Sequence, residues 1–328
     1  MRLRSVDAAA ISRAVQVLRD GGLVAIPTET VYGLAADAES ESAVRALFAA
    51  KGRPVDHPVI VHVDGANALS DWGREVPESA HRLAHAFWPG PLTLLLKRSA
   101  RARDFVTGGQ DTVGLRAPSH PWMRAVLQEF GGALAVPSAN SFGRISPTSA
   151  QHVIDDLGEK PRGKVDLILD AGPSPVGIES TIVDLSGEAP ALRRPGSITR
   201  EQLQAALGQP VPNAGALAPR ASGGLEKHYA PRTPLQMMAP EKLGAKLMTP
   251  CKKRLAVLAP LHVLQRCRAR VALAIAASEQ ADEYGRSLYA NLHRLDRSGA
   301  DLLLIAEPPA DWEAVRDRLR RAEAGAAW

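Results

Sequence analysis

Short apolar runs, separated by stretches with helical periodicity, limit the folds open to this chain more than any other feature. Residues 7–20 carry apolar side chains at helical spacing, with Asp7 placed as an N-cap and Gly21-Gly22 placed as a stop. Strands are expected at residues 23–26, 59–63, 92–97, 113–115, 133–136, 165–169, 180–185 and 191–194, and further helices near residues 41–50, 121–129 and 148–157. Strands and helices mix without strict alternation, so we expect an α/β fold with a mixed rather than an all-parallel sheet.

The composition changes in residues 209–240, where periodicity is weak and prolines are frequent, at positions 210, 212, 219, 231, 234 and 240. Such a segment is typical of a linker. Beyond it, expected strands and helices follow the pattern of a small parallel sheet, with strands at 254–258, 271–275 and 302–305 and helices at 281–297 and 312–323. We therefore predict a main domain at residues 1–208, a linker or lid at 209–240, and a small Rossmann-like α/β domain at 241–328.

The composition excludes several classes of protein. A chain of 328 residues with 45% apolar and 23% charged residues is long enough for two domains and too apolar for a disordered protein. Its net charge of +5 permits contact with nucleic acid or an anionic substrate without requiring either. Cys251 and Cys267 form no C-x-x-C pair, so neither a zinc site nor a disulfide scaffold is indicated. No segment approaches the roughly 18 uninterrupted apolar residues of a membrane span, and we expect a soluble, cytoplasmic protein.

Polar loops follow two of the expected strands directly. Residues 27–33 read Pro-Thr-Glu-Thr-Val-Tyr-Gly, and residues 137–143 read Pro-Ser-Ala-Asn-Ser-Phe-Gly. α/β proteins bind ligands at the carboxyl ends of strands, and Ser and Asn on a tight turn offer donors to an oxyanion or a phosphate. The alternative is a turn whose hydroxyls bond to the backbone, and it applies equally to residues 177–181 and 193–196. The pattern alone leaves both interpretations open.

Cations lie at two of the expected boundaries. Lys51 and Arg53 flank Gly52 at the end of a helix, where an Arg fork and a Lys point charge can cradle a phosphate. They can equally complement the helix dipole, with Pro54 ending the helix. Arg116 follows an apolar strand, and an arginine buried there needs an anionic partner. A substrate carboxylate and an internal Asp or Glu both meet that need.

Several common catalytic patterns are missing from the sequence. It has no G-x-x-x-x-G-K-[ST] phosphate loop, no G-x-G-x-x-G fingerprint, no G-x-S-x-G elbow and no H-E-x-x-H zinc motif. His81 and His85 have the i, i+4 spacing of a metal pair, but no third ligand accompanies them. What remains is a set of Lys, Arg, Ser, Thr and Asn residues at strand ends, which suits a small anionic substrate together with phosphates. Without a nucleophile–base pair, such a site works by positioning and charge neutralisation.

These segments together resemble the YrdC-like family in order and in spacing. The matching motifs are P-T-E-T-V-Y-G-L at 27–34, K-G-R-P at 51–54, P-V-I-V-H-V at 58–63, F-W-P-G-P-L-T at 87–93, V-G-L-R-A-P at 113–118, P-S-A-N at 137–140, S-P-T at 146–148, E-S-T at 179–181 and R-R-P-G at 193–196. Each motif alone is weak, whereas nine in the same order are specific. H-Y-A-P at 228–231 and S-L-Y-A-N-L-H-R-L-D at 287–296 are similar to the linker and the extra C-terminal domain of the family's long form.

The resemblance implies a twisted mixed sheet with helices around a basic, concave cavity. It also implies a nucleotidyltransferase that joins L-threonine, bicarbonate and ATP into threonylcarbamoyl-AMP (L-threonylcarbamoyladenylate) and releases pyrophosphate. Mg²⁺ is expected with the ATP substrate. A downstream threonylcarbamoyl transferase complex then passes the group to the adenosine next to the anticodon of tRNA. Direct binding of tRNA by this chain is left open.

The family's site residues carry over to matching positions. Lys51 and Arg53 resemble the catalytic pair that binds the ATP phosphates and offsets charge as pyrophosphate leaves. Arg116 resembles the residue that binds the threonine carboxylate. The remaining threonine contacts implied by the resemblance are Thr30, His62, Ser138 and Ser180, and the remaining ATP contacts are His57, Thr112, Asn140, Ser146, Arg194 and Tyr229. Tyr229 lies in the linker, which the resemblance implies to be a lid over the nucleotide.

Three positions depart from the family pattern. His57 stands where Asn is usual, residues 142–145 replace the usual S-G-K-P, and residues 222–225 replace S-P-G-M before the H-Y-A-P motif. Two other functions remain as alternatives: a carbamoyl-transfer enzyme and a non-catalytic RNA-binding protein. Enzymes of the first kind are longer and carry zinc-finger-like cysteines, and the second alternative predicts salt-dependent RNA affinity without ATP turnover.

Overall fold

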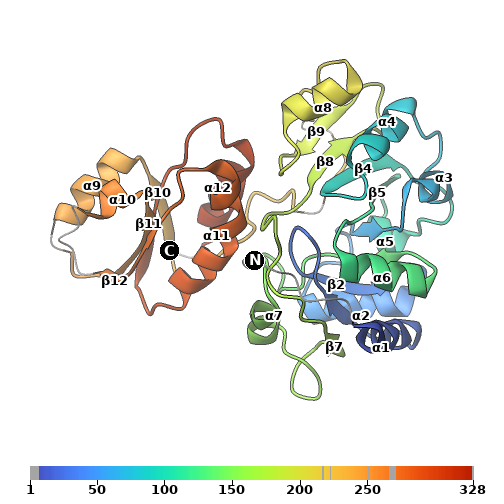
Figure 1. The fold of residues 1–328 in the computed structure, drawn as a ribbon, viewed down its shortest axis with the longest axis horizontal. Helices are drawn as coiled ribbons and strands as arrows, with labels where there is room; N and C mark the ends of the chain where they lie inside the picture. The colour runs from blue at the N-terminus through green and yellow to red at the C-terminus, as the bar shows by residue number, and fades with distance from the viewer. Residues whose placement is uncertain (1–6, 216–217, 222, 250, 266–270, 327–328) are drawn as a thin grey trace. The chain divides into compact units, whose positions relative to one another are not determined.

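A computed structural model describes residues 7–215, 218–221, 223–249, 251–265 and 271–326 of the chain. These residues form two compact units, which Figure 1 shows. The first contains the described residues up to 142 together with 147–224, and the second contains 143–146 together with those from 225 onward. Ser222 and Cys267 lie outside the described residues.

The first unit is built on a nine-stranded sheet with the strand order β7-β1-β2-β6-β3-β5-β4-β8-β9. Its elements are α1 (Ala8–Arg19), β1 (Val24–Ile26), β2 (Gly33–Asp37), α2 (Glu41–Lys51), β3 (Ile60–His62), the 3-10 helix η1 (Ala66–Ala68), α3 (Leu69–Trp72), α4 (Glu78–Phe87), β4 (Leu92–Lys97), α5 (Asp104–Thr107), β5 (Thr112–Arg116), α6 (Pro121–Phe130), β6 (Leu134–Ala135), α7 (Ala150–Asp156), β7 (Leu167–Ile168), β8 (Thr181–Asp184), β9 (Ala191–Arg194) and α8 (Arg200–Leu207). The pairs β1/β7, β3/β5 and β4/β8 are parallel and the others are antiparallel. The predicted α/β class with a mixed sheet is confirmed.

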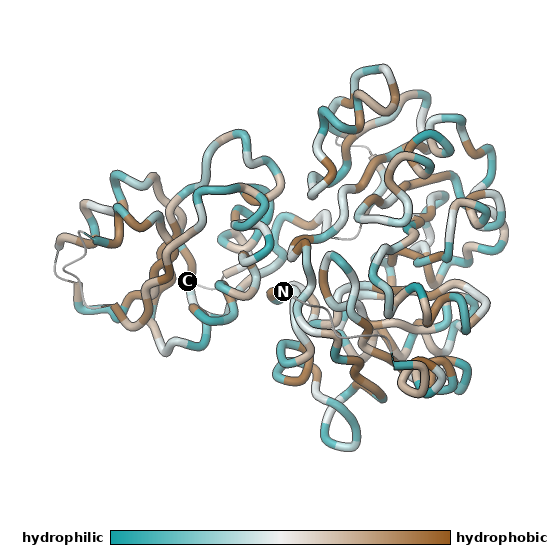
Figure 2. Tube along the Cα trace, in the orientation of Figure 1, coloured by the Kyte–Doolittle hydropathy of each residue, from teal (hydrophilic) through white to brown (hydrophobic). Residues whose placement is uncertain are grey.

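Central strands of this sheet are buried on both faces, which explains why their sequences are apolar without alternation. In β1, Val24 and Ile26 pack into one core cluster with α1 and α6, whereas Ala25 between them packs into the larger cluster that includes α2. Figure 2 shows brown, apolar stretches along the strands and teal, polar residues in many of the turns. The continuous apolar run at residues 23–26 therefore contributes side chains to two hydrophobic cores, one on each face of the sheet.

The ends of the helices fix where the first chemically important residues lie. The Asp7 carboxylate accepts two backbone N–H bonds and caps α1, as predicted. Helix α2 ends at Gly52, whose φ of +63° is in the left-handed region that glycine adopts without strain. This ending makes Lys51 the last residue of the helix and places Arg53 directly after the cap.

Six elements of the first unit were not predicted from the sequence: β2, η1, α3, α4, α5 and α8. Strand β2 follows the 27–32 loop and pairs with both β1 and β6. Its sequence, Gly-Leu-Ala-Ala-Asp, contains residues that are depleted in strands, so its position in the sheet outweighs its intrinsic preference. Helices α4 and α8 were also missed, because each buries only a narrow set of small or isolated apolar side chains.

The second unit contains a four-stranded, all-parallel sheet with the order β10-β13-β11-β12, which confirms the predicted parallel arrangement. Its elements are β10 (Leu235–Met238), α9 (Pro240–Met248), β11 (Leu255–Ala259), α10 (Leu261–Leu264), β12 (Val271–Ala276), α11 (Ala281–Asp296), β13 (Leu302–Ala306) and α12 (Glu313–Gly325). Within the described ranges, no helix is both long enough and apolar enough to cross a bilayer.

The two units do not follow the contiguous boundaries expected from the sequence. The segment 209–240, predicted as a linker, is divided between them, because Asn213 bridges to Leu192 in the first unit whereas β10 belongs to the second sheet. Residues 143–146, from within the first unit's sequence, belong to the second unit. There the Ala230 N–H donates to the Gly143 carbonyl at 2.8 Å. A four-residue contact of this kind leaves no periodic signal in a sequence.

Candidate functional site

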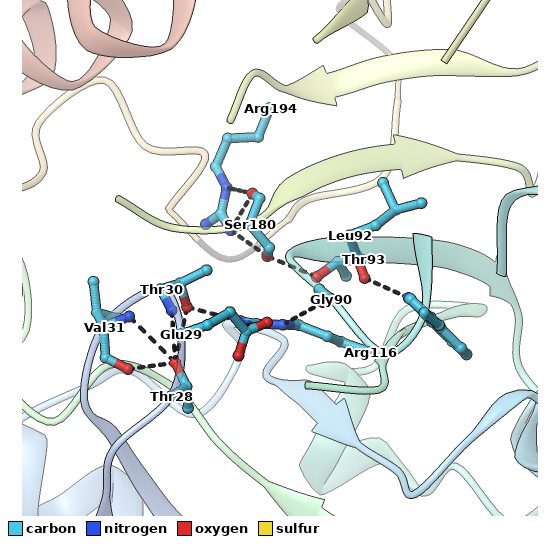
Figure 3. Close-up of polar contacts among 11 residues, drawn as sticks. Thr28, Glu29, Thr30, Val31, Gly90, Leu92, Thr93, Arg116, Ser180 and Arg194 are labelled. Carbon is cyan, nitrogen blue, oxygen red and sulfur yellow. Dashed lines mark hydrogen bonds and ion pairs between the residues drawn. The ribbon is translucent and has the colours of Figure 1, made fainter. Parts of the chain in front are cut away.

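Arg116, at the carboxyl end of β5, is held by contacts to two other segments. His62, which ends β3, is its register partner across the parallel β3/β5 pair. The Arg116 guanidinium donates from Nη1 to the Thr30 hydroxyl (3.0 Å) and from Nε to the Gly90 carbonyl (3.3 Å). Its Nη2 forms an ion pair with Glu29 Oε1 at 2.5 Å, as Figure 3 shows. Arg116, Thr30 and His62, all predicted threonine contacts, therefore lie in one place.

Glu29 is the internal acidic partner that the sequence left open as an alternative for Arg116. Both side chains are almost fully buried, with 6% of Glu29 and 5% of Arg116 exposed. The loop backbone is fixed, because the Val176 N–H donates to the Glu29 carbonyl at 2.8 Å and the Thr28 hydroxyl accepts the Thr30 N–H at 3.2 Å. Among the described residues, Oε2 of Glu29 has no hydrogen-bond partner. A rigid loop thus holds a buried carboxylate that uses only one of its oxygens.

Two buried histidines interact with this ion pair, and both are neutral. Burial, with the Arg116 charge as the second cause, holds the pKa of His62 well below its usual 6.5. Burial also lowers the pKa of His120, although the Glu29 carboxylate acts in the opposite direction. His120 Nδ1 accepts a hydrogen bond from the Trp122 N–H at 3.3 Å, which assigns the ring proton to Nε2. Neither His62 Nδ1 nor His120 Nε2 has a hydrogen-bond partner within the part of the chain that the structure describes.

Ser180, which directly precedes β8, forms a second polar group with Arg194 of β9 and Thr93 of β4. Nε and Nη2 of Arg194 donate to the Ser180 carbonyl at 3.0 and 2.8 Å, and Nη2 also donates to the Ser180 hydroxyl at 3.1 Å. That hydroxyl shares a further hydrogen bond of 2.8 Å with the Thr93 hydroxyl on β4. Figure 3 shows this group beside the Arg116 group. One predicted threonine contact and one predicted ATP contact are therefore bonded directly to each other.

Lys51 has its ammonium group buried between two backbone carbonyls. Its Nζ donates to the carbonyl of Ser138 at 2.5 Å and to the carbonyl of Asn140. An ammonium has three hydrogens, so one donor remains for a phosphate oxygen. Burial first, and the charge of Arg53 second, hold the pKa of Lys51 well below its ordinary value of 10.5, against the opposing charge of Asp156.

Arg53 lies between two aromatic rings directly after the cap of α2. Its guanidinium carbon is 5.9 Å from the ring centre of Phe48 and 5.6 Å from that of Phe142. Nη2 donates to the Pro58 carbonyl at 2.6 Å, and Nε has no hydrogen-bond partner among the described residues. Burial lowers the pKa of Arg53 to about 10, with Asp56 acting in the opposite direction. The side chain stays cationic at neutral pH and keeps donors for an anion.

Residues from the predicted linker bond to the loop that follows Arg53. Arg220 donates from Nη1 to Asp56 Oδ2 at 2.9 Å, and its backbone N–H donates to Gln110 Oε1 at 2.6 Å. Gln110 Nε2 donates back to the Arg220 carbonyl at 3.0 Å. We call Asp56, Gln110 and Arg220 the linker latch. His57 follows Asp56 directly, and burial, then the Arg53 charge, lower its pKa below 6.5.

One path of backbone contacts joins the Arg116 group to Lys51. Ser138 forms an isolated β-bridge with Gly33, which begins β2 shortly after Thr30. Lys51 bonds to the Ser138 carbonyl, and Arg116 bonds to the Thr30 hydroxyl. The two loops that were singled out in the sequence, 27–33 and 137–143, therefore contact each other within the first unit.

The remaining predicted ATP contacts lie in β5 and in the second unit. Thr112 begins β5, and its buried hydroxyl has no hydrogen-bond partner within the described ranges. Ser146 belongs to the second unit, where its carbonyl lies 3.2 Å from His293 Nε2. Tyr229 also belongs to the second unit, and the Arg318 guanidinium carbon lies 5.4 Å from its ring centre.

Some residues of this site were missed by sequence reasoning. Glu29 lies between two threonines inside the 27–34 motif. The signal that could have found it is that it is the single acidic residue among hydroxyl groups there. His120 precedes Pro121, the first residue of α6, which is a position typical of a helix cap rather than of a ligand site. No local pattern marked Arg220 as the partner of a loop far away in sequence.

The arrangement suits a small anion and a phosphate chain rather than a metal centre held by the protein. In the described part of the chain, no group of three or more His, Cys, Asp or Glu side chains is arranged to hold a metal ion. Arg116 offers a planar fork for a carboxylate, whereas Lys51 and Arg53 offer preorganised cations for phosphate oxygens.

Two family models match the chain. The Sua5/YciO/YrdC model, described as telomere recombination, matches residues 16–196. The model of the threonylcarbamoyl-AMP synthase C-terminal domain matches residues 198–324.

Relatives of known name are similar over most of the chain. A threonylcarbamoyl-AMP synthase of Pyrococcus abyssi is 36% identical over 325 residues, covering 94% of this chain and 92% of the relative. A threonylcarbamoyl-AMP synthase of Bacillus subtilis is 42% identical over 241 residues, covering 71% of this chain and 68% of the relative. The solved structure of P. abyssi Sua5 complexed with L-threonine matches with a TM-score of 0.88 at 33% identity, covering 98% of this chain and 96% of that one.

Proposed function

The chain belongs to the Sua5/YciO/YrdC family, and from that premise we propose that it is an enzyme that makes threonylcarbamoyl-AMP from L-threonine, bicarbonate and ATP. In this reaction the threonine amine becomes a carbamate, whose oxygen attacks the α-phosphorus of ATP and displaces pyrophosphate. The finer class is a nucleotidyltransferase, because an adenylyl group moves to an acceptor oxygen. The observation that carries the proposal is one network joining a buried arginine suited to a carboxylate with a buried lysine suited to a phosphate.

Arg116 is the proposed binding group for the threonine carboxylate. Its planar fork matches a carboxylate, and its burial strengthens the attraction because little water competes for the charge. The proposed contacts to the rest of the amino acid are Thr30, His62, Ser138 and Ser180. A neutral His62 suits this task, since it can bond to the threonine hydroxyl without adding a charge beside Arg116.

Lys51 and Arg53 are the proposed catalytic pair. Negative charge develops on the departing pyrophosphate as the bond to the α-phosphorus breaks. Two backbone carbonyls already orient the ammonium of Lys51, and two rings already confine Arg53, so neither cation has to reorganise at that moment. The proposed further nucleotide contacts are His57, Thr112, Asn140 and Arg194. The roles of Ser146 and Tyr229 in binding ATP, and of residues 209–240 as a lid, stay predictions.

Mg²⁺ enters this proposal as part of the ATP substrate. The triphosphate supplies the oxygen ligands that Mg²⁺ prefers, and the bound ion offsets charge on the phosphates. The product joins a carbamate to a phosphate in an anhydride, which water cleaves readily. We therefore propose that a threonylcarbamoyl transferase complex consumes it to modify adenosine next to the anticodon of tRNA, and direct contact with tRNA stays a prediction.

Release of pyrophosphate from ATP tests this proposal. The full chain with Mg²⁺ and ATP should release pyrophosphate only when both L-threonine and bicarbonate are present. Pyrophosphate release in the absence of either L-threonine or bicarbonate would contradict the proposal. Release that instead needs carbamoyl phosphate would favour the carbamoyl-transfer alternative, and salt-dependent RNA affinity without turnover would favour the RNA-binding alternative.

A further inference from the structure

Glu29 is a buried carboxylate to which the proposed reaction gives no role. It contacts Arg116 through Oε1, while Oε2 is buried and has no hydrogen-bond partner among the described residues. Glu29 is also the one carboxylate within ion-pair distance of Arg116 in the described part of the chain. A buried carboxylate is stable only when its charge is matched, so its position beside a substrate-binding arginine calls for a function.

The covalent geometry of an amino acid brings the substrate's other charge to Glu29. In any α-amino acid the amine nitrogen and the carboxylate oxygens are roughly 3 Å apart, because they are joined through one carbon. Threonine whose carboxylate binds Arg116 therefore has its ammonium group next to that guanidinium. Glu29 already contacts this guanidinium at 2.5 Å, so it is the anion that the ammonium meets.

The reaction needs a group that takes a proton from this ammonium, since a protonated amine has no electron pair to form a carbamate. The two histidines here are poor candidates. His62 would become a second buried cation beside Arg116 if it took the proton, and burial and the Arg116 charge both oppose that form. His120 carries its proton on Nε2, the nitrogen without a partner among the described residues, so it can only donate there. Arg116 itself is a cation and has no acceptor.

We propose that Glu29 receives the ammonium group of L-threonine and takes one of its protons before the carbamate forms. The ion pair between Glu29 and Arg116 opens when the threonine carboxylate binds Arg116 in place of Glu29 Oε1. The inference rests on the proposed function, because it assigns a step within the same reaction.

The step balances in atoms and charge. The Glu29 carboxylate and the threonine ammonium become a carboxylic acid and a free amine. The amine then attacks the carbon of bicarbonate, a C–N bond forms, and water leaves, which gives a carbamate group with one negative charge in addition to the carboxylate that threonine already carries. The carbamate oxygen forms a bond to the α-phosphorus of ATP as the bond to pyrophosphate breaks, and Glu29 returns its proton to solvent after the product leaves.

Burial favours this transfer. Once the threonine carboxylate has taken Arg116, the Glu29 carboxylate and the threonine ammonium are two buried charges side by side. Moving one proton from the ammonium to Glu29 removes two buried charges at once. The fixed loop backbone, held at the Glu29 carbonyl by the Val176 N–H, keeps the acceptor in place for the transfer.

Glu29→Gln tests the proposal, because glutamine has nearly the same shape and cannot accept the proton. At neutral pH its rate of threonylcarbamoyl-AMP formation should fall by about 10²-fold or more. The residual rate should rise about tenfold per pH unit below the pKa of the free amine, because solvent must then remove the proton, whereas the wild-type rate changes far less. Glu188→Gln, at an exposed turn, is the matched control and should retain the wild-type rate and profile.

The reverse reaction separates proton transfer from adenylyl transfer. ATP formation from threonylcarbamoyl-AMP and pyrophosphate does not involve the amine proton, so Glu29→Gln should make ATP near the wild-type rate. Equal losses in both directions, or an unaltered forward rate, would overturn the inference. Failure of the wild type itself to make threonylcarbamoyl-AMP would instead overturn the proposed function.

A second variant covers the case in which Glu29→Gln fails to fold, as judged by circular dichroism. Glu29→Asp keeps the carboxylate on a side chain that is shorter by one methylene group. It should lower the forward rate while keeping the shallow pH profile of the wild type. If Glu29→Asp instead showed the steep dependence of rate on pH that is expected for Glu29→Gln, a role for the carboxylate in accepting the proton would be contradicted.

Discussion

Replacing Lys51 with methionine removes an ammonium group while keeping most of the length and volume of the side chain. Two bonds to the Ser138 and Asn140 carbonyls are lost, and hydrogen bonds to charged groups contribute about 1.5–3 kcal/mol each. The change also relieves the burial of a charge, which costs several kcal/mol. Since these effects oppose each other, the folding free energy should change by less than about 2 kcal/mol.

The effect on catalysis should be much larger than the effect on stability. A preorganised group that acts on charge developing in the transition state contributes about 10²- to 10³-fold to kcat. Lys51→Met should therefore lower kcat for pyrophosphate release by this factor. The ATP KM should change much less, because the lost interaction strengthens mainly as pyrophosphate leaves.

The dependence on pH gives a second signature of the same group. Burial holds the pKa of Lys51 well below 10.5, so the ammonium loses its proton as the pH rises through that lowered value. The wild-type rate should fall as the pH rises through that lowered value, and Lys51→Met should lack that decline.

Pyrophosphate release with saturating substrates, together with a thermal melt, measures both effects. Lys164→Met, at an exposed loop position, is the matched control and should change neither. A raised ATP KM at wild-type kcat would refute the reasoning, because it would make Lys51 a binding residue only.

Three further predictions concern the rest of the site. Arg116→Lys keeps the charge but loses the planar fork, so the threonine KM should rise about 10- to 100-fold in steady-state assays; an unchanged threonine KM would remove Arg116 from the carboxylate site. Asp56→Asn breaks the ion pair of the linker latch, whose partners Arg220 and Asp56 are 49% and 60% exposed, so chemical unfolding should report little loss of stability. The same variant should raise the ATP KM more at low salt than at high salt, and a large loss of stability without a change in KM would show a purely structural role. Because the pKa of His62 is lowered in the fold, the unfolded chain binds more protons between that value and 6.5; stability is therefore complete above pH 6.5 and falls as the pH drops through this window. His62→Gln should flatten this part of a plot of Tm against pH, and an unaltered slope would contradict the assignment.

The elements that the sequence predicted well are those with a strong local signal. The strand expected at residues 92–97 is β4 with the same bounds, because its apolar run packs into both faces of the sheet. Strand β2 was missed because its Gly-Leu-Ala-Ala-Asp sequence takes its strand form from β1 and β6 on either side. The grouping of residues 143–146 with the second unit could not be predicted, because it depends on contacts with Ala230 and its neighbours, far away in sequence.

The kinds of ligand that the site binds could be predicted more readily than the contacts between its residues. Loops after strands and cations at helix ends indicated a carboxylate and a phosphate site, and Arg116 was expected to need an anionic partner. The sequence could not show that Glu29 is that partner, because the two residues are far apart along the chain. It also could not show that two backbone carbonyls orient the Lys51 ammonium group, since backbone acceptors have no signature in a sequence.

The most direct test of the proposed activity follows the carbon of bicarbonate into the nucleotide product. The full chain is incubated with ¹³C-bicarbonate, L-threonine, ATP and Mg²⁺, and the nucleotides are separated at once and analysed by mass spectrometry. We expect threonylcarbamoyl-AMP that carries a single ¹³C atom, formed in the same amount as pyrophosphate. Pyrophosphate with unmodified AMP and no labelled adduct, from a folded and freshly assayed sample, would contradict the account.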